Sequence, residues 1–170
     1  GLKTGHGPID FAHEGVSVAI RLDSIEPPPG IEPIPLTSEW VGAICSPAYL
    51  AASGVTEVSD LANERLLTTK TRPHAWKDWY SSIEEESGEL LEMEYFEHFY
   101  LLIQAAKLGL GFACVPRMLV EAELESGALV APFGFVQGPA KLVLWVSPNA
   151  RLRTDTADLE KWIKKEMAQS

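Results

Sequence analysis

The sequence has few of the features that mark a membrane protein or a disulfide-stabilised secreted domain. No apolar run approaches the roughly 20 residues of a membrane-spanning helix. Cysteine occurs twice, at Cys45 and Cys114, which is too few for a disulfide framework and predicts two free, buried thiols. The first residues, GLKTGHGPIDF, show no apolar signal-peptide core. We therefore expect a cytoplasmic location and no membrane partner.

Basic charge is also scarce. The chain has 14 Lys and Arg residues against 24 Asp and Glu residues, a formal net charge of -10. A surface that binds nucleic acid needs clustered lysine and arginine to neutralise phosphates. We therefore expect no DNA contact from this chain itself, and an acidic surface that serves mainly solubility.

Catalytic and metal-binding motifs are missing as well. The sequence contains no G-x-S-x-G, no G-x-x-x-x-G-K-[ST], no H-E-x-x-H and no C-x-x-C. The stretch GLGFAC does not match the dinucleotide-binding pattern. The histidines are scattered, at His6, His13, His74 and His98, which favours polar contacts over a metal site. We expect no catalytic residue, no metal and no cofactor, and hence a protein that is not an enzyme.

What is present is an alternation of strand-like and helix-like segments. VSVAIRL is typical of a buried strand, and SPAYLAASG has Ser46 as a helix N-cap and Gly54 as the end. Near residues 94–120, Gly109 ends a helix in a left-handed turn, and Gly111 lets the backbone of the next strand pass close to a neighbour or ligand. The alternation predicts an α/β fold with a mixed or mostly parallel sheet.

Several segments, in order along the chain, resemble one protein family. They are DFAHEGVSVAIR, ICSPAYLAASG, DLANERLLTTKTRPHAWKDWY, EHFYLLIQAAKLGLGFACVPRMLVEAELESGALVAPF and KLVLWVSPNARL. Together they resemble the effector-binding domain of LysR-type transcriptional regulators, and most of all the branch of the glycine-cleavage activator and the β-lactamase regulator.

The resemblance implies a type II periplasmic-binding-protein-like fold, with two Rossmann-like lobes joined by two crossover strands around a small-molecule cleft. Lobe I would comprise 1–43, in incomplete form, and 114–170, and lobe II would comprise 44–113. The crossover strands, near Ile44 and Ala113, would run side by side, bring the two cysteines near each other and keep the strands from forming a single continuous sheet. Relative to the family, the N-terminal helix-turn-helix and the first part of lobe I would be absent.

Candidate effector-binding residues follow from this fold, because small-molecule sites favour the carboxyl ends of strands and the amino ends of helices. Each candidate pair follows or opens one element. The candidates are Thr4, Gly5, Arg21, Asp23, Thr68, Thr69, His98, Phe99, Phe112 and Ala113. Other roles stay open: Arg21 can pair with Asp23, the two threonines can satisfy a strand end, and Phe99 can belong to the core.

The function that the resemblance implies is effector sensing. A small metabolite, an amino acid or another carboxylate, would bind between the lobes. It would bias the arrangement of the subunits in a homodimer or tetramer, which would bind DNA through the N-terminal domain. An extracytoplasmic solute-binding protein is one alternative, and it predicts a signal peptide. An enzyme on the same bilobal fold is another, and it predicts a clustered acid, base or nucleophile.

Overall fold

The computed structural model describes residues 2–4, 18–88, 90, 93–147, 158 and 161–165 of the 170-residue chain, with the backbone alone for residues 2–4. The chain divides into two compact units. The first combines residues 1–39 with 139–170, and the second is residues 40–138. The lobe boundaries implied by the resemblance stay a prediction, because the compact units group residues by contacts alone.

The first unit joins strands from two distant parts of the sequence. Strand β1 (Leu2–Thr4) pairs in parallel with β2 (Val18–Leu22), and β2 pairs antiparallel with β7 (Val136–Val146) in a register that sets Ile20 opposite Leu144. Alternate residues of β2 and β7 enter two different apolar clusters, so both faces of these strands are covered. Ile163 from the helical residues 161–165 completes one cluster.

The second unit contains a four-strand arrangement in the order β3-β6-β4-β5. Strand β6 (Phe112–Pro116) pairs antiparallel with β3 (Ile34–Ile44) and in parallel with β4 (Leu66–Thr69), which pairs in parallel with β5 (Met93–Phe96). The connections carry the helices: α1 (Pro47–Ser53), η1 (Val58–Asn63), α2 (Ala75–Ser82), α3 (Phe99–Lys107), η2 (Arg117–Leu119) and α4 (Glu121–Ser126). Parallel neighbours require such crossovers, which confirms the expected α/β class.

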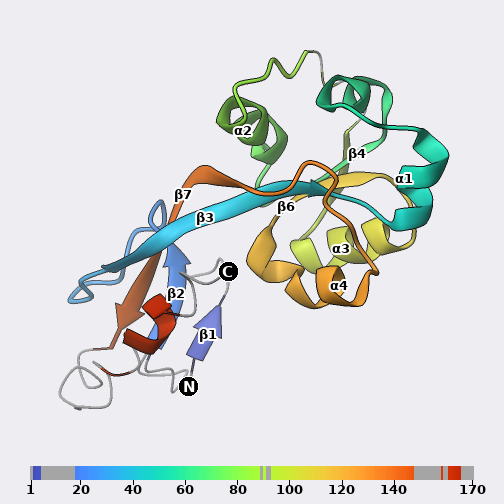
Figure 1. Cartoon of the computed structure of the whole chain (residues 1–170). Coiled ribbons are helices and arrows are strands. Elements are labelled where there is room, and N and C mark those ends of the chain that lie inside the picture. Colours follow the sequence, from blue (N-terminus) through green and yellow to red (C-terminus); the bar gives the residue numbers. More distant parts are fainter. Residues whose placement is uncertain are drawn as a thin grey trace. The chain divides into compact units, whose positions relative to one another are not determined.

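Helices cover both faces of the strands in the second unit. Ala113 and Val115 of β6 pack with α3, whereas Phe112 and Cys114 pack with the aromatic side chains of α2. Figure 1 shows α2 on one side of these strands and α3 with α4 on the other. The aromatic side chains of α2, at Trp76, Trp79 and Tyr80, are almost fully buried and therefore belong to the core.

The two crossover segments lie side by side as the sequence predicts. Ile44 of β3 is the register partner of Ala113 of β6. Cys114 lies opposite Ala43, two residues before Cys45, and both thiols are free and buried. One expectation is wrong: the strands form a single hydrogen-bonded order, β1-β2-β7-β3-β6-β4-β5. The reason is that β3 and β7 are 11 residues long, and each contributes residues to both units.

Two glycines explain the sharp end of α3 and the start of β6. Gly109 has φ +78, the left-handed conformation that glycine adopts without a steric penalty. A Cβ atom on Gly111 would lie 2.3 Å from the backbone oxygen of Arg65. The close neighbour of Gly111 is therefore the residue just before β4, whose carbonyl accepts a hydrogen bond from the Phe112 amide at 2.9 Å.

We predict that Gly111→Ala lowers the free energy of unfolding by about 2–3 kcal/mol, because the new methyl group would overlap backbone. Gly54→Ala is the control for a purely conformational cost: Gly54 has φ +70, which strains any other residue, but has no atom within 4 Å of the added Cβ. Its cost is expected to be about 1 kcal/mol. Urea unfolding of both variants measures the difference, and equal losses would contradict the steric account.

Alkaline pH should destabilise the domain through Cys45. Burial, reinforced by the charge of Glu64, raises the pKa of the Cys45 thiol from 9.0 to about 11. Above pH 9 the unfolded thiol loses its proton while the folded thiol keeps it, so stability falls as pH rises toward 11. We expect about 1 kcal/mol of this loss at pH 10.

Denaturation of the wild-type protein and Cys45→Ala between pH 8 and 10 tests this expectation. The variant should lose less stability over that range. Tyr49→Phe is the comparison for a neighbouring group, because burial and the hydrogen bond to Glu64 raise the pKa of Tyr49 from 10.0 to about 12. The contribution of Tyr49 begins only near pH 10, so this variant should follow the wild-type profile more closely than Cys45→Ala does. Parallel pH profiles for wild type and Cys45→Ala would refute the assignment to the thiol.

Candidate functional site

The carboxyl end of β4 carries a compact group of polar side chains. Thr68 and Thr69 are each 1% exposed. The Thr68 hydroxyl donates to the backbone oxygen of Arg72 at 3.3 Å, and the Thr69 hydroxyl accepts from the Arg72 amide at 3.1 Å. Thr69 also shares a 2.9 Å hydrogen bond with the hydroxyl of Thr71. The two threonines thus satisfy the strand end and at the same time fix the turn that follows it.

Strand β5 brings a second predicted segment to the same place. Thr69 is the register partner of Phe96, and the Lys70 amide donates to the Phe96 oxygen at 2.9 Å. His98 and Phe99 follow within three residues and open α3. Because the carboxyl ends of parallel strands meet at one edge, the pairs Thr68–Thr69 and His98–Phe99 are brought together.

Arg72 links the turn after β4 to the start of α3. Its guanidinium carbon lies 5.4 Å from the centroid of the Phe99 ring, within the range of a cation–π contact. Phe99 itself is 8% exposed and packs in the core, which was its alternative role. The ring therefore holds a positive charge at the amino end of α3 without itself being exposed.

The amino end of α3 adds backbone donors to this group. His98, the N-cap residue, is exposed and extended (φ -157, ψ 168), and its side chain does not cap the helix. The first amides of an α-helix have no partner within the helix and carry positive partial charge. Lys70 forms an exposed ion pair with Glu97 nearby, so its own charge is balanced. We call Thr68, Thr69, Arg72, His98 and Phe99 the β4-end cluster.

The candidates of the first unit have separate surroundings. Arg21 is 3% exposed, donates to the Ile20 oxygen at 3.3 Å and lies 5.8 Å from the centroid of the Trp145 ring. Asp23 is exposed, and its carboxylate accepts from the Lys141 amide at 3.3 Å. Thr4 ends β1, opposite Ile20, and only its backbone is described. Gly5 lies outside the described residues. The roles of all four in effector binding stay predictions.

The two candidates on β6 lie apart from the β4-end cluster. Phe112 pairs with Leu66 at the amino end of β4, is 0% exposed and packs edge-to-face with Tyr49, with 5.5 Å between ring centroids. Ala113 is equally buried, between Ile44 and Leu67. Both side chains are fully packed, so their contact with an effector stays a prediction that their burial does not support.

Arg72 is the residue that sequence reasoning missed. A usable signal was present: the stretch TKTRP places an arginine in the loop between the strand end and the proline that precedes α2. Within the part of the chain that the structure describes, no group of three His, Cys, Asp or Glu side chains could hold a metal ion. Among the same residues, no helix has the length and apolar character to cross a membrane.

The threonine hydrogen bonds lead to a stability prediction. We expect Thr69→Val to lower the free energy of unfolding by about 1–2 kcal/mol, because it removes the buried hydroxyl that accepts from the Arg72 amide. Thr71→Val, at an exposed residue of the same turn, should cost less than half as much. Thermal denaturation of both variants provides the comparison, and a loss for Thr71→Val equal to that for Thr69→Val would contradict the description of the turn.

Comparison with known proteins gives a consistent match. The family model described as "LysR substrate binding domain" matches residues 2–168. The chain is 34% identical over 170 residues to the HTH-type transcriptional regulator TrpI of Pseudomonas aeruginosa, covering 98% of this chain and 57% of that protein. It is 28% identical over 109 residues to the glycine cleavage system transcriptional activator of Escherichia coli K12, covering 64% of this chain and 35% of that protein.

Solved structures agree on the fold. The effector domain of AmpR from Pseudomonas aeruginosa has a TM-score of 0.73 at 22% identity, covering 94% of this chain and 76% of that one. The AmpR effector-binding domain from Citrobacter freundii gives 0.73 at 20% identity, covering 95% and 80%. The chain spans about half the length of TrpI and a smaller share of the glycine cleavage activator. On the family-model match and the similarity to TrpI, this chain belongs to the LysR substrate-binding domain family, with the type II periplasmic-binding-protein-like fold of its effector domains.

Proposed function

We propose that this domain binds a small metabolite at the β4-end cluster and thereby modulates the DNA binding of a full-length LysR-type regulator. Family membership supports the sensing role. The observation that carries the location is the convergence of two buried threonines, Arg72 and the amino end of α3 at one edge of the second unit. Small-molecule sites in α/β folds favour such strand ends.

The chemistry of the cluster favours a ligand with a carboxylate, such as an amino acid. Arg72 supplies a full positive charge, and the first turn of α3 supplies backbone N–H groups whose dipoles point toward an anion. The hydroxyls of Thr68 and Thr69 are buried and bonded within the turn, so their proposed role is to hold the Arg72 backbone, and with it the charge, in place for the ligand.

The proposed mechanism is a shift of equilibrium. A ligand changes a conformational equilibrium only by the difference between its affinities for the two states, and about 1–3 kcal/mol is enough for a 5–150-fold response. DNA contact is assigned to a helix-turn-helix domain outside this chain, in keeping with the formal charge of -10 here. The matched relatives are named as transcriptional regulators, which supports a cytoplasmic location and a role without catalysis.

The partner of this domain in the regulator is proposed to be a second copy, in a homodimer or tetramer. Helix α3 and its C-cap residue expose large apolar side chains, at Tyr100 (67%) and Leu101 (42%) in the helix and at Leu108 (79%) at the cap. Side chains of this size on one helix indicate a protein contact surface when they lie together. Nothing in the described residues favours a solute receptor or an enzyme over this assignment.

Calorimetry of the domain against amino acids, dipeptides and small keto acids tests the proposal. At least one member should bind, and Thr68→Val or Arg72→Leu should weaken that binding about tenfold, which corresponds to about 1.4 kcal/mol. Thr56→Val is the control, because Thr56 is exposed and its hydroxyl bonds to Asp60 near η1.

Two results would count against the proposal. One is the absence of heat and of any thermal shift across the panel. The other is a ligand whose affinity is the same for wild type, Thr68→Val and Arg72→Leu, because such a ligand would bind somewhere other than the β4-end cluster.

A further inference from the structure

We infer that the second unit carries an additional small-molecule site beside α2. This site accepts an anion with a flat apolar body, such as an aromatic carboxylate. The structure has a cavity of about 390 Å³ there, lined by residues from the start of α2, by Ser87, Gly88 and Leu90, and by Met93 at the start of β5. Cavities of about 300–1,000 Å³ are the usual size for small-molecule sites. None of the β4-end cluster residues lines it, so this inference goes beyond the proposed function.

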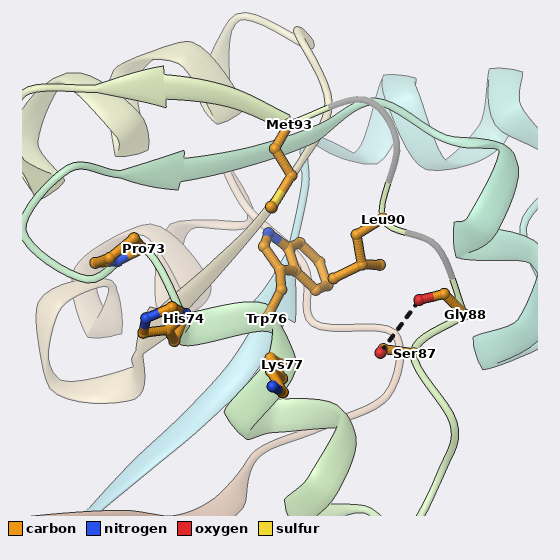
Figure 2. Close-up of a pocket in the computed structure, with 8 residues that line it drawn as sticks. All are labelled: Pro73, His74, Trp76, Lys77, Ser87, Gly88, Leu90 and Met93. Atoms are coloured by element: carbon orange, nitrogen blue, oxygen red, sulfur yellow. Dashed lines mark hydrogen bonds between the residues drawn. The ribbon is translucent and has the colours of Figure 1, made fainter.

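The floor of the cavity is apolar and rigid. The Trp76 indole is 1% exposed, and its Nε1 donates to the backbone oxygen of Leu67 at 2.9 Å. Trp79 packs edge-to-face on it, with 5.6 Å between ring centroids. Figure 2 shows Leu90 beside the indole and Met93 reaching toward it from β5. A wall held by a hydrogen bond and by aromatic packing suits a flat apolar body, because little side-chain entropy is lost when a ligand binds.

The rim of the cavity is basic. His74, the N-cap of α2, and Lys77 in its first turn both line the cavity and are exposed (Figure 2). Neither side chain forms a salt bridge or hydrogen bond with any residue that the structure describes, although the backbone oxygen of His74 accepts from the Asp78 amide within the helix. Asp78 is the acidic residue of that turn, and it does not line the cavity.

The charge of the lining differs from that of the whole chain. Acidic residues outnumber basic ones by 24 to 14 in the sequence, yet no described lining residue is acidic. The Ser87 hydroxyl also lines the cavity (Figure 2). It donates only a long 3.4 Å hydrogen bond to the Gly88 oxygen, so it can turn toward a ligand. An apolar floor with a basic rim and one hydroxyl matches a carboxylate attached to an aromatic ring.

Nuclear magnetic resonance of the domain with matched probes tests this inference. The probes are benzoate and indole-3-carboxylate, each paired with its uncharged carboxamide. The carboxylates should shift the Trp76 indole N–H signal in a saturable way with a Kd below about 1 mM. The carboxamides should bind at least about fivefold more weakly, because they lack the charge that Lys77 and His74 would contact.

Three variants test whether the Lys77 charge contributes to binding and whether the probes bind beside α2. Lys77→Met should weaken carboxylate binding about fivefold and leave carboxamide binding unchanged, since it keeps the length of the side chain and removes its charge. Lys107→Met, at an exposed residue that ends α3, is the matched control and should change neither. Thr68→Val should leave benzoate binding intact, which separates this site from the β4-end cluster.

Three outcomes would overturn the inference: no saturable shift of the Trp76 signal with any probe, equal affinities for carboxylates and carboxamides, or loss of benzoate binding in Thr68→Val. The last outcome would place the probe in the β4-end cluster and so support the proposed function while removing the second site. Circular dichroism of each variant confirms that a lost signal is not a lost fold.

Discussion

The burial of strand β6 is the constraint on which the second unit depends. All five of its residues are buried, with β3 on one side and β4 on the other. Its alternate side chains enter two different apolar clusters, one under α3 and one under α2. A strand covered on both faces must read as a nearly continuous apolar run, and FACVP does. The closeness of Gly111 to the Arg65 oxygen then fixes where β6 meets β4.

The position of the β4-end cluster follows from that packing. Because β4 is parallel to both of its neighbours, its carboxyl end lies beside that of β5, and the chain must leave by helices on either face. The turn after Thr69 leads into α2, and the residues after Phe96 lead into α3. Two helix starts and a strand end therefore meet at one edge, where the threonine hydroxyls hold the turn and the Phe99 ring supports the Arg72 guanidinium.

Several features of the second unit could be predicted from the sequence, some from local chemistry and some from the family resemblance. Gly109 and Gly111 mark a helix end and a close backbone contact, and the crossover pairing of Ile44 with Ala113 follows from the family resemblance. The convergence of Thr68 with His98 follows from the parallel order of the strands. Glycine conformation is a local property of the sequence. The pairing of strands that are far apart in sequence is not, and it was available only through the resemblance.

The remaining features depend on side-chain direction and long-range packing. Phe112 stays a predicted effector contact, but the alternation of the strand turns its side chain into the core against Tyr49, which the sequence does not reveal. Residues 128–133, ALVAPF, have the apolar composition of a strand but contribute an isolated bridge between Val130 and Cys45. The stretch TKTRP marks Arg72 as a loop residue but does not reveal its contact with Phe99, which depends on the shape of one turn. The cavity beside Trp76 depends on how Ser87, Gly88 and Leu90 pack against α2, which no local pattern encodes.

In the proposed function, the ligand of this domain lies at the carboxyl end of β4. The most direct test is to map backbone amide shifts of the isotope-labelled domain on addition of a metabolite that binds it. The account predicts that the largest changes fall on residues 68–72 and on the first turn of α3. Changes confined to β1, β2 and β7, with those two segments unmoved, would contradict it.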